Sequence, residues 1–385
     1  MVIVHIAPNA PYNDYWGYQD NLLPKYQKKL GHDVTLIITN TMHEGGKVVE
    51  TECREYTLND GVKVIRMAVK KQLHPLLTVL TAYMSVYDKL KELKPDFIFY
   101  HGCVSTTIYD VVKYKKKINP DCVIVQDNHL DYNIGRVCIG IRSYVVRAHY
   151  RRIHRKTRKY ITRVYGVTPW RKAYAEDYFA VSPDKTDVLI MGADDEKIDF
   201  ENRAAIRQKI RAEYGVSDNE FLVVTGGKID AKKKIHLLMK ACGELRGVKL
   251  LVFGNVKDDI KEEFDALVEK HDNITYIGWL DADKVYDYFF AADLVAFPGQ
   301  HSVLWEQACA CKVPCLFEKW EGMDHVNNGG NSVLVAPITE EILKQSIEEL
   351  KFTEKYAEMK KIAESDATDV YLYSKIAEKS LECAK

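Results

Sequence analysis

Two lysines near the middle of the chain are spaced to hold an anionic ligand. The apolar run Phe221–Thr225 leads into Gly226-Gly227-Lys228-Ile229-Asp230-Ala231-Lys232-Lys233-Lys234, and an amphipathic stretch follows. Glycines let the backbone approach a ligand closely, and a helix N-terminus offers unpaired N–H groups to an anion. Lys228 and Lys233 would then flank a diphosphate as point charges. The alternative is a solvated lysine run at the start of a helix.

A glutamate follows a second apolar run in the same half. Leu294–Phe297 ends in Pro298-Gly299, and the segment from His301 to Ala308 then has the pattern of a helix. This places Glu306 about one turn into that helix. Its carboxylate can accept two hydrogen bonds from a vicinal diol such as that of ribose. The alternative role is simple complementarity to the helix dipole.

Polar side chains also follow two apolar runs in the first half of the chain. Phe97–Tyr100 ends in His101, and Cys122–Val125 is followed by Gln126, Asp127, Asn128 and His129. The carboxyl ends of parallel strands are where ligands bind to such sheets. These residues are therefore candidates for a site, and the alternative for each is a capping or turn role.

Short apolar runs alternate with longer amphipathic stretches along the chain, which predicts an α/β fold with parallel sheets. A length of 385 residues favours two domains. The charged segment between Met191 and Glu220 lacks a buried-strand run and marks the break. We expect an acceptor-binding domain over residues 1–195 and a donor-binding domain over residues 196–368. A final helix, residues 369–385, is expected to return to the first domain.

The composition excludes few partners but favours one compartment. Lys+Arg and Asp+Glu number 55 each, so net charge points to no partner. The N-terminus shows no signal peptide pattern, and no uninterrupted apolar run is long enough to span a membrane. Nine cysteines, an odd number without an export signal, indicate reduced thiols. We therefore expect a cytoplasmic protein.

The segment Arg142–Arg163 is strongly basic. It holds nine Lys/Arg residues and no acidic residue, with aromatic and aliphatic side chains between them. Such a segment is typical of a helix on an anionic membrane surface, a solvated helix face, or a nucleic-acid patch. We favour peripheral attachment to the cytoplasmic face of a membrane. Nucleic acid is disfavoured because no recognised nucleic-acid module accompanies the patch.

The order of these motifs resembles a known family. Gly227-Lys228-Ile229-x-x-x-Lys233, Val252-Phe253-Gly254-Asn255, Gly278-Trp279-Leu280, Ala292–Pro298, Glu306-Gln307-Ala308 and Val313-Pro314 follow one another as in the donor domain of GT-B, family-4-type retaining glycosyltransferases (glycosyl transferases group 1). The resemblance covers residues 221–337 well and the first half more loosely. It implies a GT-B fold, with two Rossmann-like parallel-sheet domains facing a cleft.

The resemblance also implies roles for individual residues. The nucleotide-sugar donor would contact Gly17, Gly227, Lys228, Lys233, Gly278, Ser302, Val303 and Glu306. An acceptor would lie against Tyr15, Trp16 and His101, although these aromatics could simply cover the sheet edge. Asp127 and His129 would line the catalytic centre, while Lys228 and Lys233 would stabilise the leaving diphosphate. Retaining transfer of this kind needs no protein nucleophile, and we expect neither a metal nor another cofactor.

Two positions depart from the family pattern. Lys228 stands where an arginine is usual, which keeps the charge but loses the bidentate fork. Pro298 stands eight residues before Glu306, where the family carries an acid that contacts the donor sugar. The leading hypothesis is transfer of a hexose from a UDP- or GDP-sugar to a glycan or lipid-linked acceptor in cell-surface polysaccharide synthesis. Two alternatives are a catalytically inactive GT-B partner subunit and a GT-B nucleotide-sugar epimerase.

Overall fold

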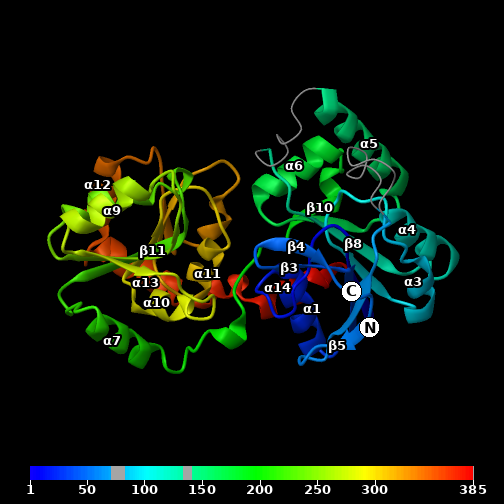
Figure 1. Cartoon of the computed structure of the whole chain (residues 1–385), viewed down its shortest axis with the longest axis horizontal. Helices are drawn as coiled ribbons and strands as arrows, with labels where there is room; N and C mark the ends of the chain where they lie inside the picture. Colours follow the sequence, from blue (N-terminus) through cyan, green and yellow to red (C-terminus); the bar gives the residue numbers. More distant parts are fainter. Residues whose placement is uncertain (71–82, 133–140, 385) are drawn as a thin grey trace. The chain divides into compact units, whose positions relative to one another are not determined.

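The computed structural model describes residues 1–70, 83–132 and 141–384 of the chain, which is shown in Figure 1. The chain divides into two compact units, Met1–Ile190 with Ile376–Lys385, and Met191–Lys375. The sequence places the corresponding boundaries at residues 195/196 and 368/369, a few residues away from these.

The first unit is built on an eight-stranded sheet with the order β10-β9-β8-β7-β1-β2-β6-β5. All neighbouring strands are parallel except β5 and β6, which are antiparallel. In chain order the strands are β1 (Val2–Ala7), β2 (Asp33–Thr39), β5 (Glu55–Thr57), β6 (Lys63–Met67), β7 (Phe97–Tyr100), β8 (Val123–Asn128), β9 (Arg163–Gly166) and β10 (Thr186–Val188). Strand order reverses between β1 and β7, so residues after these two strands lie at a topological switch point.

Helices complete the first unit, together with a small hairpin. The hairpin pairs β3 (Thr41–Glu44) with β4 (Lys47–Glu50). The helices are α1 (Gln19–Lys29), α3 (Tyr87–Leu93), α4 (Ile108–Lys117), α5 (Ile141–Thr157) and α6 (Pro169–Phe179). Buried aliphatic and aromatic residues of β1, β7, β8, α4, α5 and α6 form one continuous core.

The second unit is built on a six-stranded parallel sheet with the order β13-β12-β11-β14-β15-β16. The strands are β11 (Phe221–Ile229), β12 (Val248–Val256), β13 (Ile274–Gly278), β14 (Leu294–Phe297), β15 (Cys315–Glu318) and β16 (Ser332–Val335). Order reverses between β11 and β14, which makes this the switch point of a Rossmann-type sheet. The predicted mixed α/β class with two parallel-sheet domains is confirmed.

Helices cover both faces of this second sheet. They are α7 (Arg203–Glu213), α8 (Ile235–Gly243), α9 (Lys261–Lys270), α10 (Val285–Ala291), α11 (Leu304–Ala310), α12 (Glu340–Leu350), α13 (Glu354–Ala363) and α14 (Tyr373–Ser380), the last of which ends in the first unit. Figure 1 shows α9 and α12 on one side of the sheet and α7 and α10 on the other. Within the described residues, no helix is both long and apolar enough to cross a membrane.

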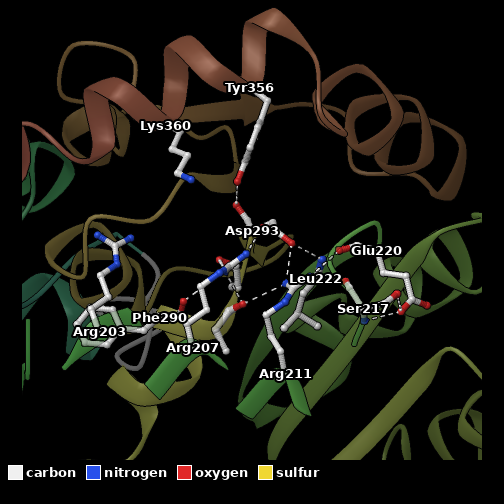
Figure 2. A network of polar contacts seen from close by, with 12 residues as sticks. Arg203, Arg207, Arg211, Ser217, Glu220, Leu222, Phe290, Asp293, Tyr356 and Lys360 are labelled. Carbon is white, nitrogen blue, oxygen red and sulfur yellow. Dashed lines mark hydrogen bonds and ion pairs between the residues drawn. The ribbon is translucent and has the colours of Figure 1, made fainter. Parts of the chain in front are cut away.

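A buried ion-pair network fixes the start of β14 (Figure 2). The Asp293 carboxylate accepts hydrogen bonds from Arg207 (2.6 Å), Arg211 (3.0 Å) and the backbone N–H of Leu222 (2.7 Å). The Tyr356 hydroxyl donates to the Asp293 carbonyl oxygen at 3.1 Å. Because these partners come from α7, β11 and α13, the carboxylate and backbone carbonyl of one residue tie three elements to the strand that leads into the candidate site.

Candidate functional site

The candidate donor site lies at the switch point of the second sheet, where β11 and β14 end side by side. The strand β11 runs on to Ile229, so Gly227 and Lys228 lie within this strand and not in the turn that the sequence suggested. A short 3-10 turn, Ala231–Lys233, separates this strand from α8. The Asp230 carboxylate caps that turn by accepting from the backbone N–H groups of Lys232 and Lys233.

The turn after β11 and the turn after β14 are packed backbone against backbone. Gln300 N–H donates to the carbonyl of Lys232 at 3.1 Å. A Cβ added at Gly299 would lie 2.3 Å from the carbonyl atoms of Lys233, so this contact requires glycine. Gly227 has a φ of +102°, and a Cβ there would lie 2.8 Å from Leu304. These glycines are therefore explained by close packing around the site.

The two candidate lysines have different environments. Lys233 is half-buried, and its Nζ donates to the carbonyls of Gln300 (2.6 Å) and His301 (3.2 Å). Burial lowers the pKa of Lys233, and the nearby Lys228 charge lowers it further against the opposing effect of Asp230. Lys228 is exposed and pairs with Asp230 at 2.9 Å, which raises its pKa. An arriving anion would thus meet one ammonium already fixed in place and one free to swing from Asp230.

Both lysines line one cavity of about 280 Å³. It is also lined by Gly226, Asp230, Ile235, Phe297, Gly299, Gln300, Ser302, Leu304 and Trp305. Among the described residues, the backbone N–H groups of Ser302 and Val303 donate to no other group. Ser302 lines the cavity beside the two ammonium groups, and such a combination suits an anion. The cavity volume is just below the range of about 300–1,000 Å³ that is usual for small-ligand pockets.

Glu306 lies beneath this cavity and not at its surface, which differs from the expected ribose contact. Its side chain is fully buried, and its Oε1 accepts from the Nε2 atoms of His301 and His325, both at 2.8 Å. Burial opposes ionisation, but the charges and hydrogen bonds of the two histidines hold the pKa of Glu306 well below its usual range. Its Oε2 is buried with no partner among the described residues. Only Oε2 could therefore accept a further hydrogen bond, whereas a ribose diol would need both carboxylate oxygens of Glu306.

His301, Glu306 and His325 are also the described residues that could hold a metal ion, since their ligand atoms lie within 4.8 Å of one another. Two imidazoles and a carboxylate form a set that zinc accepts. The observed Nε2–Oε1 distances of 2.8 Å are those of hydrogen bonds, however, and a ligating nitrogen must first lose its proton. The geometry favours a hydrogen-bonded triad. Neither histidine was among the predicted site residues, although His301 lies only five residues before Glu306 in the sequence.

The remaining donor and acceptor candidates lie in loops. Gly278 ends β13 with a φ of +75°, and the next residue, Trp279, is highly exposed. Gly17 is exposed, and a Cβ there would meet nothing within 4 Å, so its conformation does not require glycine. Tyr15 is exposed, whereas Trp16 stacks on His43 at a centroid distance of 5.5 Å. None of these positions shows a contact that assigns it to a ligand.

In the first unit the structure brings His101, Asp127 and His129 together. His101 Nδ1 lies 2.8 Å from Asp127 Oδ2, and His129 Nε2 lies 3.3 Å from the same oxygen. His101 is buried and its Nε2 contacts His5, so both of its ring nitrogens are engaged within the unit and neither is available for the expected acceptor contact in this structure. Asp127 is also fully buried, and only His129 is exposed. His5 was missed because a lone histidine within a strand carries no sequence signal.

Comparisons with known proteins concern the family and the fold of the chain. Residues 206–366 match the profile of the family described as Glycosyl transferases group 1. The sequence matched none of the curated proteins that were searched.

Solved structures similar to this chain share its fold over nearly the whole length. Sucrose-phosphate synthase from Thermosynechococcus elongatus aligns with a TM-score of 0.66 at 16% identity, covering 98% of this chain and 96% of that one. Anabaena HepE in complex with UDP and glucose aligns with a TM-score of 0.64 at 16% identity, covering 99% and 98%. WaaG, a glycosyltransferase involved in lipopolysaccharide biosynthesis, aligns with a TM-score of 0.63 at 16% identity, covering 98% of each chain.

Proposed function

We propose that this chain, a GT-B protein whose residues 206–366 belong to the glycosyl transferases group 1 family, transfers a hexose from a UDP- or GDP-sugar to an acceptor hydroxyl. One observation carries the proposal: the segments after β11 and β14 bring the ammonium groups of Lys228 and Lys233, together with Ser302, to the lining of a single cavity. This arrangement suits the diphosphate of an activated sugar.

The structural relatives support this choice of substrate. HepE was solved with UDP and glucose, and WaaG takes part in lipopolysaccharide biosynthesis. By analogy we assign to this chain a glycan or lipid-linked acceptor and a role in cell-surface polysaccharide synthesis.

The chemistry we propose is electrostatic and proceeds with retention. Lys233 is held by two carbonyl groups and needs little reorganisation to stabilise the negative charge that develops on the departing diphosphate. Lys228 exchanges Asp230 for a phosphate oxygen. The donor phosphate receives the acceptor proton, so no protein nucleophile and no metal takes part. His129, the exposed member of its cluster, is assigned to the sugar end of the reaction.

We also propose that the protein is cytoplasmic and attaches peripherally to an anionic membrane through the segment Arg142–Arg163. The side chain of Arg142 itself lies outside the described part. Nearby, a hollow of about 390 Å³ is lined by Lys113, Lys116, Lys117, Lys156 and Lys159. These lysines form no ion pair with another described residue, so they add unbalanced positive charge next to α5. Flotation with vesicles should require anionic lipid, and equal flotation with neutral vesicles would contradict the attachment.

A transfer assay tests the proposed activity. A thermal-shift panel of UDP- and GDP-sugars identifies the donor, because a ligand that binds the native state raises its apparent stability. The donor labelled in its sugar is then incubated with the protein and with candidate glycan and lipid acceptors. Transfer or slow hydrolysis supports the proposal. Isomerisation of the donor alone would assign an epimerase, and donor binding without either reaction would assign an inactive partner subunit, as the position of Pro298 suggests.

A further inference from the structure

A chain of buried polar side chains runs through the first unit, at the switch point between β1 and β7. It begins at Ser380 of α14, passes through Gln27 of α1 and His5 of β1, and ends at His101 and Asp127. All five side chains are buried, and His5, Gln27, Ser380 and Asp127 are fully so. Buried polar groups of this kind must satisfy one another, so the position of each proton can be worked out from its neighbours.

The donor-to-acceptor direction along this series of hydrogen bonds is set at Ser380. Its hydroxyl donates to the carbonyl of Ala377 at 2.7 Å, so Oγ accepts from Gln27 Nε2 at 2.8 Å. This turns Gln27 Oε1 towards His5 Nε2, also at 2.8 Å, and the proton of that pair must lie on His5 Nε2. Burial, with the charge of His101 next in effect, lowers the pKa of His5 to about 3. His5 is therefore neutral, and its Nδ1 is an acceptor.

His101 thus lies between two acceptors. Its Nε2 is 3.0 Å from His5 Nδ1, and its Nδ1 is 2.8 Å from Asp127 Oδ2. Both nitrogens must carry a proton to satisfy both contacts. Burial opposes a charge on the ring, but Asp127 and, more weakly, Asp20 outweigh it and raise the pKa of His101.

The carboxylate of Asp127 is held from several sides. Its Oδ1 accepts from the backbone N–H of Gly102 at 2.6 Å, and its Oδ2 faces both His101 and His129. Burial favours the neutral acid, but His129 and His101 outweigh it and lower the pKa of Asp127. The titratable groups that face Asp127 are therefore His101, His129 and Asp20.

We propose that His101 is a permanent imidazolium and a positioning residue, which keeps Asp127 ionised and oriented. Asp127 in turn holds Nε2 of the exposed His129, and this leaves Nδ1 of His129 free to act on substrate. The catalytic part of this statement rests on the proposed transferase function. The protonation state of His101 does not, because it follows from hydrogen bonds within the unit.

Nitrogen-15 NMR of the full-length protein, labelled in its histidine rings, tests the protonation state without any substrate. At about pH 8, where a free histidine is neutral, one histidine should show two protonated ring nitrogens, and its signals should vanish in His101→Gln. If His101 Nε2 carries no proton, the hydrogen bonds are donated in the opposite sense, from the Gln27 amide group through the two histidines to Asp127. That result would overturn the proposal.

His5→Phe removes the acceptor that holds the second proton of His101, while keeping an aromatic ring against Phe99. Its His101 should titrate at lower pH than in the wild type. The matched control is His154→Phe, which removes another buried histidine, one whose ring lies 3.4 Å from the Cys103 carbonyl and packs against Phe179. The control should leave the His101 signals in place, and equal titration shifts in both variants would contradict the proposal.

Kinetics separate positioning from simple structural damage. In His5→Phe, kcat for transfer should fall about tenfold while KM stays within about twofold, and the pH profile should move with the His101 titration. An unchanged profile would overturn the positioning role. If the wild type transfers no sugar, the transferase proposal fails, and the NMR result still decides the charge of His101.

Discussion

Replacing Asp293 by asparagine should destabilise the second unit more than any change to an exposed ion pair. The carboxylate accepts three hydrogen bonds, from Arg207, Arg211 and Leu222, and the side chains of Asp293 and Arg211 are each only 7% exposed (Figure 2). An amide keeps the shape but offers one acceptor and one donor group, so at least one N–H donor would face another donor. Breaking a buried pair in this way costs about 3–5 kcal/mol.

Urea unfolding, followed by tryptophan fluorescence, measures this cost. The matched control is Asp265→Asn, which removes an exposed pair with Lys261 in which both side chains are 56% exposed. The control should lose less than about 0.5 kcal/mol. A loss below about 1 kcal/mol in Asp293→Asn would refute the reasoning, because it would show that the buried arginines find other partners at little cost.

Three further predictions concern the site and its surroundings. Gly299→Ala should abolish binding of UDP, because the added methyl group would meet the carbonyl of Lys233. Gly17→Ala should leave the thermal stability unchanged, because its added methyl group would meet nothing within 4 Å. Equal thermal stability of the two variants would contradict the packing argument. The pKa of His5 is about 6.5 in the unfolded chain and about 3 in the folded one, so between these pH values only the unfolded chain binds a proton there. Acidification from pH 7 to about pH 4 should therefore lower the free energy of unfolding by about 3 kcal/mol through this group. Urea midpoints at both pH values should show a smaller loss in His5→Phe than in the wild type. If hydrogen bonds alone hold Glu306, elemental analysis should find no stoichiometric metal and EDTA should leave UDP binding unchanged, whereas one bound zinc per chain would assign a metal to the triad.

The strands were predicted well where burial on both faces gives a continuous apolar run. Phe97–Tyr100 and Leu294–Phe297 have the same bounds in the sequence analysis and in the structure. The hairpin of β3 and β4 was missed because none of its strand residues is buried and they show no such run. Local patterns therefore predict core strands better than edge pieces, whose stability depends on partners far away in the sequence.

The sequence indicated which strands the candidate residues follow, but not how deeply their side chains are buried. The order of motifs placed Lys228 and Lys233 at the carboxyl end of β11, where the structure also has them. Whether a polar side chain is exposed depends on what packs over it, which is why Glu306 and His101 were expected to meet a ligand and are buried instead. His325 hydrogen-bonds to Glu306 from 19 residues further along the sequence, and no spacing rule reveals that contact.

Calorimetric titration of UDP and GDP into the wild type, Lys233→Ala and Lys232→Ala tests the central claim most directly. Lys233 points into the cavity and is fixed by two carbonyl groups, whereas its neighbour Lys232 is exposed and does not line the cavity. We predict that one of the two nucleotides binds, that Lys233→Ala weakens binding about 10- to 100-fold, and that Lys232→Ala changes it less than about threefold. Binding of neither nucleotide, or equal affinities in the wild type and Lys233→Ala, would contradict a diphosphate site at this switch point.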